Sequence, residues 1–228
     1  MNKIIQVAGI IDAEEAKMLM ELGVEYLGFP LRLPVNKEDL TEDEAVEVIK
    51  GIHHPHKAAL ITYLNDAEEI INFCDKLNVK VVQLHGDINS QQLKLLKNRR
   101  PDIEVIKSLV VRKNNLTELE NIVKISSQWI DLYITDTFDP ETGASGATGK
   151  THDWNVSKRL IEISPKPVIL AGGLNPFNVR EAILSTNPVG VDVHTGIESV
   201  NGRKDQQMTK QFIKESISAF KELEIALG

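Results

Sequence analysis

Short runs of β-branched and other apolar residues alternate along the chain with longer stretches in which apolar residues recur every three or four positions. The short runs predict eight strands, at residues 4–8, 25–29, 58–62, 79–84, 104–108, 129–134, 167–171 and 190–193. Each run leads into a stretch with the helical period. The strands are almost continuously apolar, which is typical of a parallel sheet that is buried on both faces. The pattern therefore predicts eight successive β/α units.

Side chains that cap helix N-termini stand before four of the helical stretches. These are Asp12 with Glu15, Thr41 with Glu44, Asn175 with Pro176, and Asp205 with Gln206 and Gln207. A capping oxygen accepts a hydrogen bond from an amide two or three residues later, and proline suits the first helical position. We expect helices to begin at these four places.

Two folds arrange alternating strands and helices in this way, the closed (β/α)8 barrel and the open doubly wound sheet. A doubly wound dinucleotide-binding domain would carry a Gly-rich fingerprint after its first strand, but residues 8–12 contain one glycine. No linker rich in Pro, Gly or Ser divides the chain. We therefore expect residues 1–228 to form a single (β/α)8 TIM-barrel domain.

Composition narrows the range of functions. The chain carries 26 Lys and Arg against 33 Asp and Glu, and the basic residues are scattered, which argues against nucleic-acid binding. The one cysteine, Cys74, excludes an internal disulfide and a Cys-rich zinc site, and its place within a predicted helix is typical of an inert buried thiol. No segment has the pattern of a signal peptide or membrane span. We expect a cytoplasmic protein with no metal, nucleic-acid or membrane partner.

In a (β/α)8 barrel the substrate binds at the carboxyl ends of the strands. The last two predicted strands lead into glycine-bearing turns, with Gly172 and Gly173 after one and Thr195 and Gly196 after the other. Glycine lets backbone amides approach an anion, and barrels commonly hold phosphate after strands seven and eight. An isolated Gly-Gly pair is usually only a tight turn. Two such turns in both expected places favour a phosphate site.

Asp136 closes the sixth predicted strand and precedes a loop with glycines at 143, 146 and 149. A carboxyl group beneath such a loop suits a general acid or base, because burial raises its pKa towards neutrality. A lone Asp more often caps a turn, but this position favours catalysis. His85 and Lys107, at the fourth and fifth strands, are as well explained by a hydrogen-bonded layer inside the barrel.

Four short motifs stand at the predicted strand ends. They are Val-Gln-Leu-His-Gly at 82–86, the segment 136–154 that ends in Gly-Lys-Thr-His-Asp-Trp, Gly-Gly-Leu-Asn-Pro-Phe-Asn-Val at 172–179, and Val-Asp-Val at 191–193 with Gly-Ile-Glu at 196–198. Together they resemble the phosphoribosylanthranilate isomerase family of tryptophan biosynthesis, and Gly-Arg-Lys-Asp at 202–205 is similar to that family's start of the last helix. The resemblance spans nearly the whole chain.

The resemblance implies a barrel of the ribulose-phosphate-binding type that converts an N-phosphoribosyl arylamine to a 1-amino-1-deoxyribulose phosphate without a cofactor. In the family, an aspartate at the position of Asp136 protonates the furanose ring oxygen, and a cysteine thiolate on strand one removes the C2 proton. Carried across by motif, the candidate residues for binding the phosphate and the rest of the substrate are His85, Gly172, Gly173, Asp192, Thr195 and Gly196.

The chain departs from the family at strand one. The family reads Lys-Ile-Cys-Gly-Ile-Thr where residues 6–11 read Gln-Val-Ala-Gly-Ile-Ile, so Ala8 replaces the base. Loss of a positioned base typically costs about 10² to 10⁴ in rate. His194 follows Asp192 by two residues on strand eight, which lies beside strand one in a closed barrel. An imidazole with a near-neutral pKa is a suitable replacement base, so His194 is a candidate catalytic residue; the alternative is that it orients the phosphate.

Other departures lie nearby. The family's arginine after strand two, which pairs with the anthranilate carboxylate, aligns with Glu38, and Arg32 is a candidate to bind that anion instead. The family's Phe before Asp-Trp is His152, and its Ser-Ser after strand eight is His194 and Thr195. Because these changes gather at the site while the phosphate turns remain, altered chemistry is favoured over simple loss.

Three functions follow. The first is an isomerase for phosphoribosylanthranilate or a related phosphoribosylamine, which takes a small phosphorylated sugar-amine as its partner and is a monomer or homodimer. The second is a non-catalytic phosphosugar-binding paralogue, which predicts affinity without turnover. The third is an aldolase- or epimerase-like enzyme that uses an inward Lys107 as a Schiff base or acid. An inward lysine of this kind also resembles an ordinary interior layer of a barrel.

Overall fold

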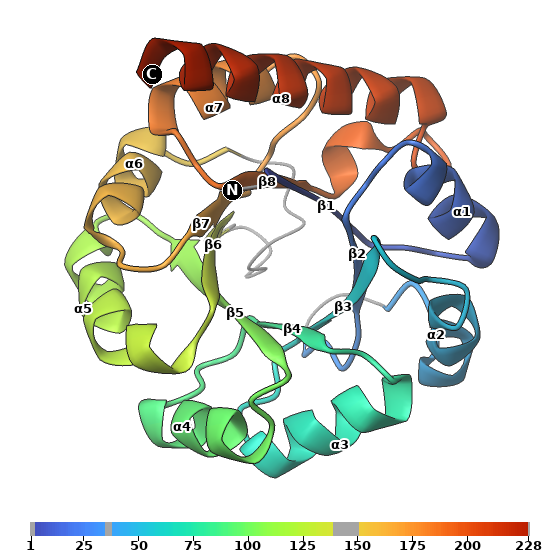
Figure 1. The fold of residues 1–228 in the computed structure, drawn as a ribbon, viewed down its shortest axis with the longest axis vertical. Coiled ribbons are helices and arrows are strands. Elements are labelled where there is room, and N and C mark those ends of the chain that lie inside the picture. The colour runs from blue at the N-terminus through green and yellow to red at the C-terminus, as the bar shows by residue number, and fades with distance from the viewer. Residues whose placement is uncertain (1–2, 35–37, 139–150, 228) are drawn as a thin grey trace.

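The computed structural model describes residues 3–34, 38–138 and 151–227, and within them eight parallel strands close into a barrel surrounded by eight helices (Figure 1). The strands are β1 (Ile4–Ala8), β2 (Tyr26–Pro30), β3 (Lys57–Thr62), β4 (Val81–Leu84), β5 (Glu104–Val111), β6 (Leu132–Thr137), β7 (Val168–Leu170) and β8 (Gly190–Val193). The helices are α1 (Ala13–Glu21), α2 (Glu42–Ile49), α3 (Ala67–Leu77), α4 (Ser90–Arg99), α5 (Leu116–Ser126), α6 (Trp154–Ile163), α7 (Val179–Thr186) and α8 (Gln206–Leu227), with short 3-10 helices η1 (Ser127–Trp129) and η2 (Thr195–Ile197). The expected (β/α)8 barrel is confirmed. None of the helices in the described ranges is long and apolar enough to cross a membrane.

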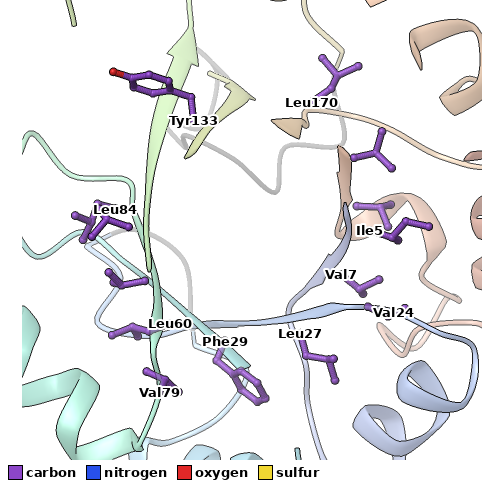
Figure 2. Packing of buried hydrophobic residues seen from close by; sticks show 14 of the residues in the cluster. Ile5, Val7, Val24, Leu27, Phe29, Leu60, Val79, Leu84, Tyr133 and Leu170 are labelled. Carbon is purple, nitrogen blue, oxygen red and sulfur yellow. The ribbon is translucent and has the colours of Figure 1, made fainter. Parts of the chain in front are cut away.

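Alternation along the strands divides the apolar residues between two faces. Outward side chains such as Val7, Leu27, Phe29 and Tyr133 lie between the barrel and its helices (Figure 2). A separate inward cluster fills the barrel, and it comprises Ile4, Tyr26, Ala59, Val81, Ile106, Leu132, Ile134, Ile169 and Ala171. This inward apolar layer closes the interior below the carboxyl ends of the strands, where inward polar residues replace it.

Three strand boundaries lie three residues from the prediction, and they are the start of β6, its end at Thr137 and the end of β5. β6 begins at Leu132 rather than 129, because residues 127–129 form η1. β5 continues three residues beyond the predicted 108, and its added residues pair with the end of β6, where Val110 lies opposite Asp136. The two strands extend together because each supplies the other's hydrogen-bonding partners.

Three of the four predicted helix starts are confirmed. The side chain of Asp12 accepts a hydrogen bond from the Glu15 amide, Thr41 forms a capping box, and Asp205 accepts from the Met208 amide. The fourth is wrong, because α7 begins at Val179. The Asn175 side chain instead accepts from the amide two residues later, which closes a turn before the helix.

Candidate active site

A chain of polar side chains crosses the barrel interior near the carboxyl ends of the strands. Gln6 Nε2 on β1 donates to Gln83 Oε1 on β4, at 2.7 Å. Gln83 Nε2 lies 3.0 Å from His85 Nε2, and that nitrogen lies 3.5 Å from Asp136 Oδ2 on β6. Sequence reasoning missed the two glutamines. Strand alternation could have found them, since Gln83 precedes His85 by two residues.

This network fixes the tautomer of His85. Because Gln83 Oε1 accepts from Gln6, Gln83 Nε2 is a donor, so His85 Nε2 accepts and His85 Nδ1 carries the proton. Burial and the nearby Lys107 charge lower the pKa of His85 to about 3, so the ring is neutral. His85 Nδ1 is buried without a partner among the described residues. The expected binding residue thus has one N–H group available to a ligand.

Asp136 lies in β6, and its Oδ1 accepts a hydrogen bond of 2.7 Å from the Thr137 amide. Burial raises the pKa of Asp136 to about 7, against the weaker lowering effect of that hydrogen bond. A carboxyl group with this pKa is part protonated and part ionised at neutral pH, as a general acid requires. The glycines at 143, 146 and 149 of the following loop lie outside the described residues.

Asp192 lies in β8 at the position that pairs with Gln6 of β1. Its neighbours Val191 and Val193 face the helices, so its own side chain faces the barrel interior. Its Oδ1 is buried and has no hydrogen-bond partner among the described residues. Burial and then the charge of Asp136 raise the pKa of Asp192 to about 7. A second carboxyl group with unusually high proton affinity therefore faces the same space.

His194 lies where strand alternation placed it, beside the end of β1. Its ring lies so close to Gly9 that a Cβ atom on that glycine would come within 2.0 Å of His194 Nε2. The same nitrogen is 3.5 Å from Glu198 Oε1, and that oxygen also accepts a hydrogen bond of 2.5 Å from Lys204 Nζ. Burial and the Lys204 charge lower the pKa of His194 to about 3. The expected near-neutral pKa of this imidazole is therefore wrong.

Ala8 offers no acid or base at the end of β1. It is 5% exposed and lies against β2, where a Cβ atom on Gly28 would come within 3.3 Å of Ala8 Cβ. β1 pairs with β8 on its other side. A group that replaces the strand-one base must therefore come from a neighbouring strand or loop.

The turns after β7 and β8 lie against each other. Gly172 and Gly173 adopt φ angles of 97° and 64°, which other residues rarely adopt. A Cβ atom on Gly172 would lie 2.2 Å from Thr137 Oγ1, and one on Gly196 would lie 1.9 Å from the Leu174 carbonyl oxygen. The structure thus brings together the two turns that the sequence assigned to phosphate, and each requires its glycine.

His152 connects the end of β6 to α6. Its Nδ1 lies 2.8 Å from Thr137 Oγ1, and its Nε2 lies 2.6 Å from Ser157 Oγ. Burial lowers the pKa of His152 to about 4, so the ring is neutral. The histidine that replaces the family's phenylalanine therefore packs against the Gly172 turn.

Arg32 is already paired. Its Nε lies 2.8 Å from Glu42 Oε1, and its guanidinium carbon lies 3.9 Å from the centre of the Phe73 ring. Glu38 accepts hydrogen bonds from the amides of Arg32 and Leu33. A substrate anion that bound Arg32 would have to compete with Glu42.

The expectation that Lys107 points into the barrel is wrong. It alternates with the inward Ile106 and shares its face with Val105 and Leu109, which lie under the helices. Its Nζ donates to the Gly86 carbonyl at 2.9 Å, and burial lowers its pKa to about 8. This lysine holds the turn after β4, and its placement gives no support to a Schiff-base role. Cys74 is buried, and burial raises its pKa to about 12, as expected of an inert thiol.

Comparison with known proteins gives one consistent result. A family model described as N-(5'-phosphoribosyl)anthranilate (PRA) isomerase matches residues 5–215. The N-(5'-phosphoribosyl)anthranilate isomerase 2 of Methanosarcina mazei is 33% identical over 217 residues, which cover 95% of each chain. The isomerase of Aquifex aeolicus is 33% identical over 216 residues, which cover 94% of this chain and 98% of that one.

Solved structures agree with the barrel. Phosphoribosyl anthranilate isomerase from Thermotoga maritima has a TM-score of 0.79 at 26% identity, covering 95% of this chain and 99% of that one. A second isomerase structure, in complex with reduced 1-(o-carboxyphenylamino)-1-deoxyribulose 5-phosphate, has a TM-score of 0.77 at 24% identity, with coverage of 95% and 99%. At that identity the second likeness shows the fold alone.

Proposed function

The chain belongs to the N-(5'-phosphoribosyl)anthranilate isomerase family, and we propose that it is an enzyme catalysing the isomerisation for which that family is named. The substrate is an N-(5'-phosphoribosyl) arylamine and the product a 1-amino-1-deoxyribulose 5-phosphate. The overall change is an internal oxidation–reduction between C1 and C2, which requires proton transfers. The observation that carries the proposal is the buried carboxyl group of Asp136, whose pKa of about 7 suits an acid at the carboxyl end of β6.

Asp136 is the general acid that protonates the furanose ring oxygen. His85 Nδ1, a donor beside it with no partner in the described part of the chain, is a binding group for the substrate. The backbone amides of the touching turns at Gly172, Gly173, Thr195 and Gly196 bind the phosphate, because glycine leaves these amides open to an anion. Arg32 binds the aryl carboxylate of the substrate, and this interaction replaces its hydrogen bond to Glu42.

The residue that acts as the base and removes the C2 proton still has to be identified, because Ala8 carries no ionisable group. Two side chains of the neighbouring strand lie beside it, Asp192 within β8 and His194 just after β8. The same alanine favours a second candidate function, a phosphosugar-binding protein without turnover. The first experiment must therefore separate binding from catalysis.

The test is conversion of freshly generated phosphoribosylanthranilate, followed as loss of anthranilate-type fluorescence. We expect turnover by the natural protein and a fall in kcat of about 10² to 10⁴ in Asp136→Asn, with KM little changed. Asp43→Asn, a change at an exposed aspartate on α2, is the matched control. No turnover together with binding of reduced 1-(o-carboxyphenylamino)-1-deoxyribulose 5-phosphate would favour the non-catalytic function instead.

A further inference from the structure

We propose that Asp192 is the base that replaces the missing strand-one thiol and removes the C2 proton of the substrate. This inference rests on the proposed function. β8 pairs directly with β1, and Asp192 lies opposite Gln6, two residues before Ala8. Both Gln6 and Ala8 have inward side chains, as does Asp192, so the carboxyl group faces the same interior space as the Ala8 methyl group.

One oxygen of this carboxyl group accepts no hydrogen bond from the residues that the structure describes. Asp192 Oδ1 is buried and has no hydrogen-bond partner among the described residues. Buried carboxylate oxygens are almost always hydrogen-bonded in native proteins, so an open one needs an explanation. Because the side chain faces the barrel interior and feels the charge of Asp136, a substrate proton can be the missing partner.

The charges around Asp192 let it act as the base while Asp136 acts as the acid. The groups that face it are Asp136 from β6, Gln6 from β1 and Lys204 from the segment before α8; His194, two residues on, is neutral. Burial and the charge of Asp136 raise the pKa of Asp192, and Gln6 and Lys204 oppose this with smaller lowering effects. The resulting pKa is about 7. Because two coupled carboxyl groups do not ionise together readily, one carries the proton while the other is free to accept one.

His194, which directly follows the end of β8, is the weaker candidate. Its pKa of about 3 means that the ring holds a proton poorly, because burial and Lys204 disfavour the imidazolium. A base with that pKa has little driving force to take a proton from carbon near pH 7. The pKa of Asp192, about 7, is much closer to the working pH.

The proton transfers balance. Asp136 gives its proton to the ring oxygen, the C1–O bond breaks with its electron pair left on oxygen, and the nitrogen lone pair forms the C1=N bond. The carboxylate of Asp192 takes the C2 proton, the C–H pair forms the C1=C2 bond, and the C=N pair returns to nitrogen. Asp192 then returns its proton to C1, and the enol O–H proton passes to Asp136. The C2 ketone forms, and both carboxyl groups regain their starting states.

The test compares kcat, KM and affinity for the reduced product analogue in three variants and the natural protein. We expect Asp192→Asn to lower kcat by about 10² to 10⁴ with analogue affinity retained, and His194→Gln to lower kcat by less than about tenfold. Ala8→Cys added to Asp192→Asn should restore at least about tenfold of the lost kcat, because the thiol supplies a second base in the same space. A merely structural role for Asp192 would not be rescued by a thiol on β1.

A further variant keeps the inference testable if Asp192→Asn folds poorly. Gln6→Lys places an ammonium group beside Asp192, which lowers the pKa of that carboxyl, so the acid limb of the kcat profile should move down by about one pH unit or more. An unmoved limb contradicts the inference. Turnover in the natural protein that survives Asp192→Asn overturns the inference alone. No turnover in the natural protein overturns the inference and the proposed function together.

Discussion

Replacing the acid of the site should stabilise the protein at alkaline pH. Asp136 has a pKa of about 7 in the folded chain, mainly through burial, against about 3.9 in an unfolded chain. A group whose folded pKa is raised contributes stability below its unfolded pKa and loses it as the pH rises through the folded one. One pKa unit is about 1.4 kcal/mol, so the ionised carboxyl costs at most about 4 kcal/mol near pH 8.

Asp136→Asn removes that titration while keeping the volume and the oxygen that accepts from the Thr137 amide. We expect the free energy of unfolding to rise by about 2 to 3 kcal/mol near pH 8 and to change by less than about 1 kcal/mol near pH 4. The expected gain near pH 8 is smaller than the full penalty because the two carboxyl groups interact. The charge of Asp136 raises the pKa of Asp192, and Asp192 ionises more readily once that charge is removed.

Urea denaturation at several pH values between about 4 and 8 measures this difference. Glu162→Gln, a change at an exposed carboxylate on α6, is the control and should show no such dependence on pH. Equal free energies of unfolding for Asp136→Asn and the natural protein near pH 8 would refute the argument, because Asp136 would then ionise in the folded chain without penalty.

Three other changes test separate features. Gly172→Ala, at a φ of 97° and facing Thr137, should cost about 2 to 4 kcal/mol in urea denaturation and raise KM, whereas Gly202→Ala, at a φ of 82° in open space, should cost about 1 kcal/mol and leave KM unchanged. Cys74, with a pKa of about 12, should react with a thiol reagent only as fast as the protein unfolds, and rapid labelling of the folded chain would contradict its burial. Arg32→Met should raise KM about tenfold with kcat little changed; an unaltered KM would mean that Arg32 only pairs with Glu42.

The sequence was sufficient for the fold because its strands are short, apolar and regularly spaced. Alternation of period two and period 3.6 carries that information locally. The ends of β5 and β6 were less predictable, since Val110 joins the sheet only because β6 offers it a partner opposite Asp136. The end of β5 therefore depends on its pairing with β6, and the local sequence of β5 does not reveal that pairing.

The candidate site was predictable in position but not in its electrostatics. Asp136 could be placed from the strand end, whereas the link from Gln6 to Gln83 joins side chains 77 residues apart across the barrel. The lowered pKa of His194 depends on burial and on Lys204, which lies just before α8 and pairs with Glu198. Proton affinities follow from burial and from such returning charges, and neither can be read from a strand motif.

The two departures at strand one, Gln6 and Ala8, both bear on the role of Asp192 in the adjoining strand. A lysine at position 6, as in the family motif, would place an ammonium beside Asp192 and keep the pKa of that carboxyl low. Gln6 supplies no charge, and the pKa of Asp192 is raised to about 7 instead. The chain that lacks a thiol at Ala8 thereby has a carboxyl group of matched proton affinity on the adjoining strand. A random loss of function would have no reason to pair these two changes, and their pairing therefore favours a relocated base over a decayed enzyme.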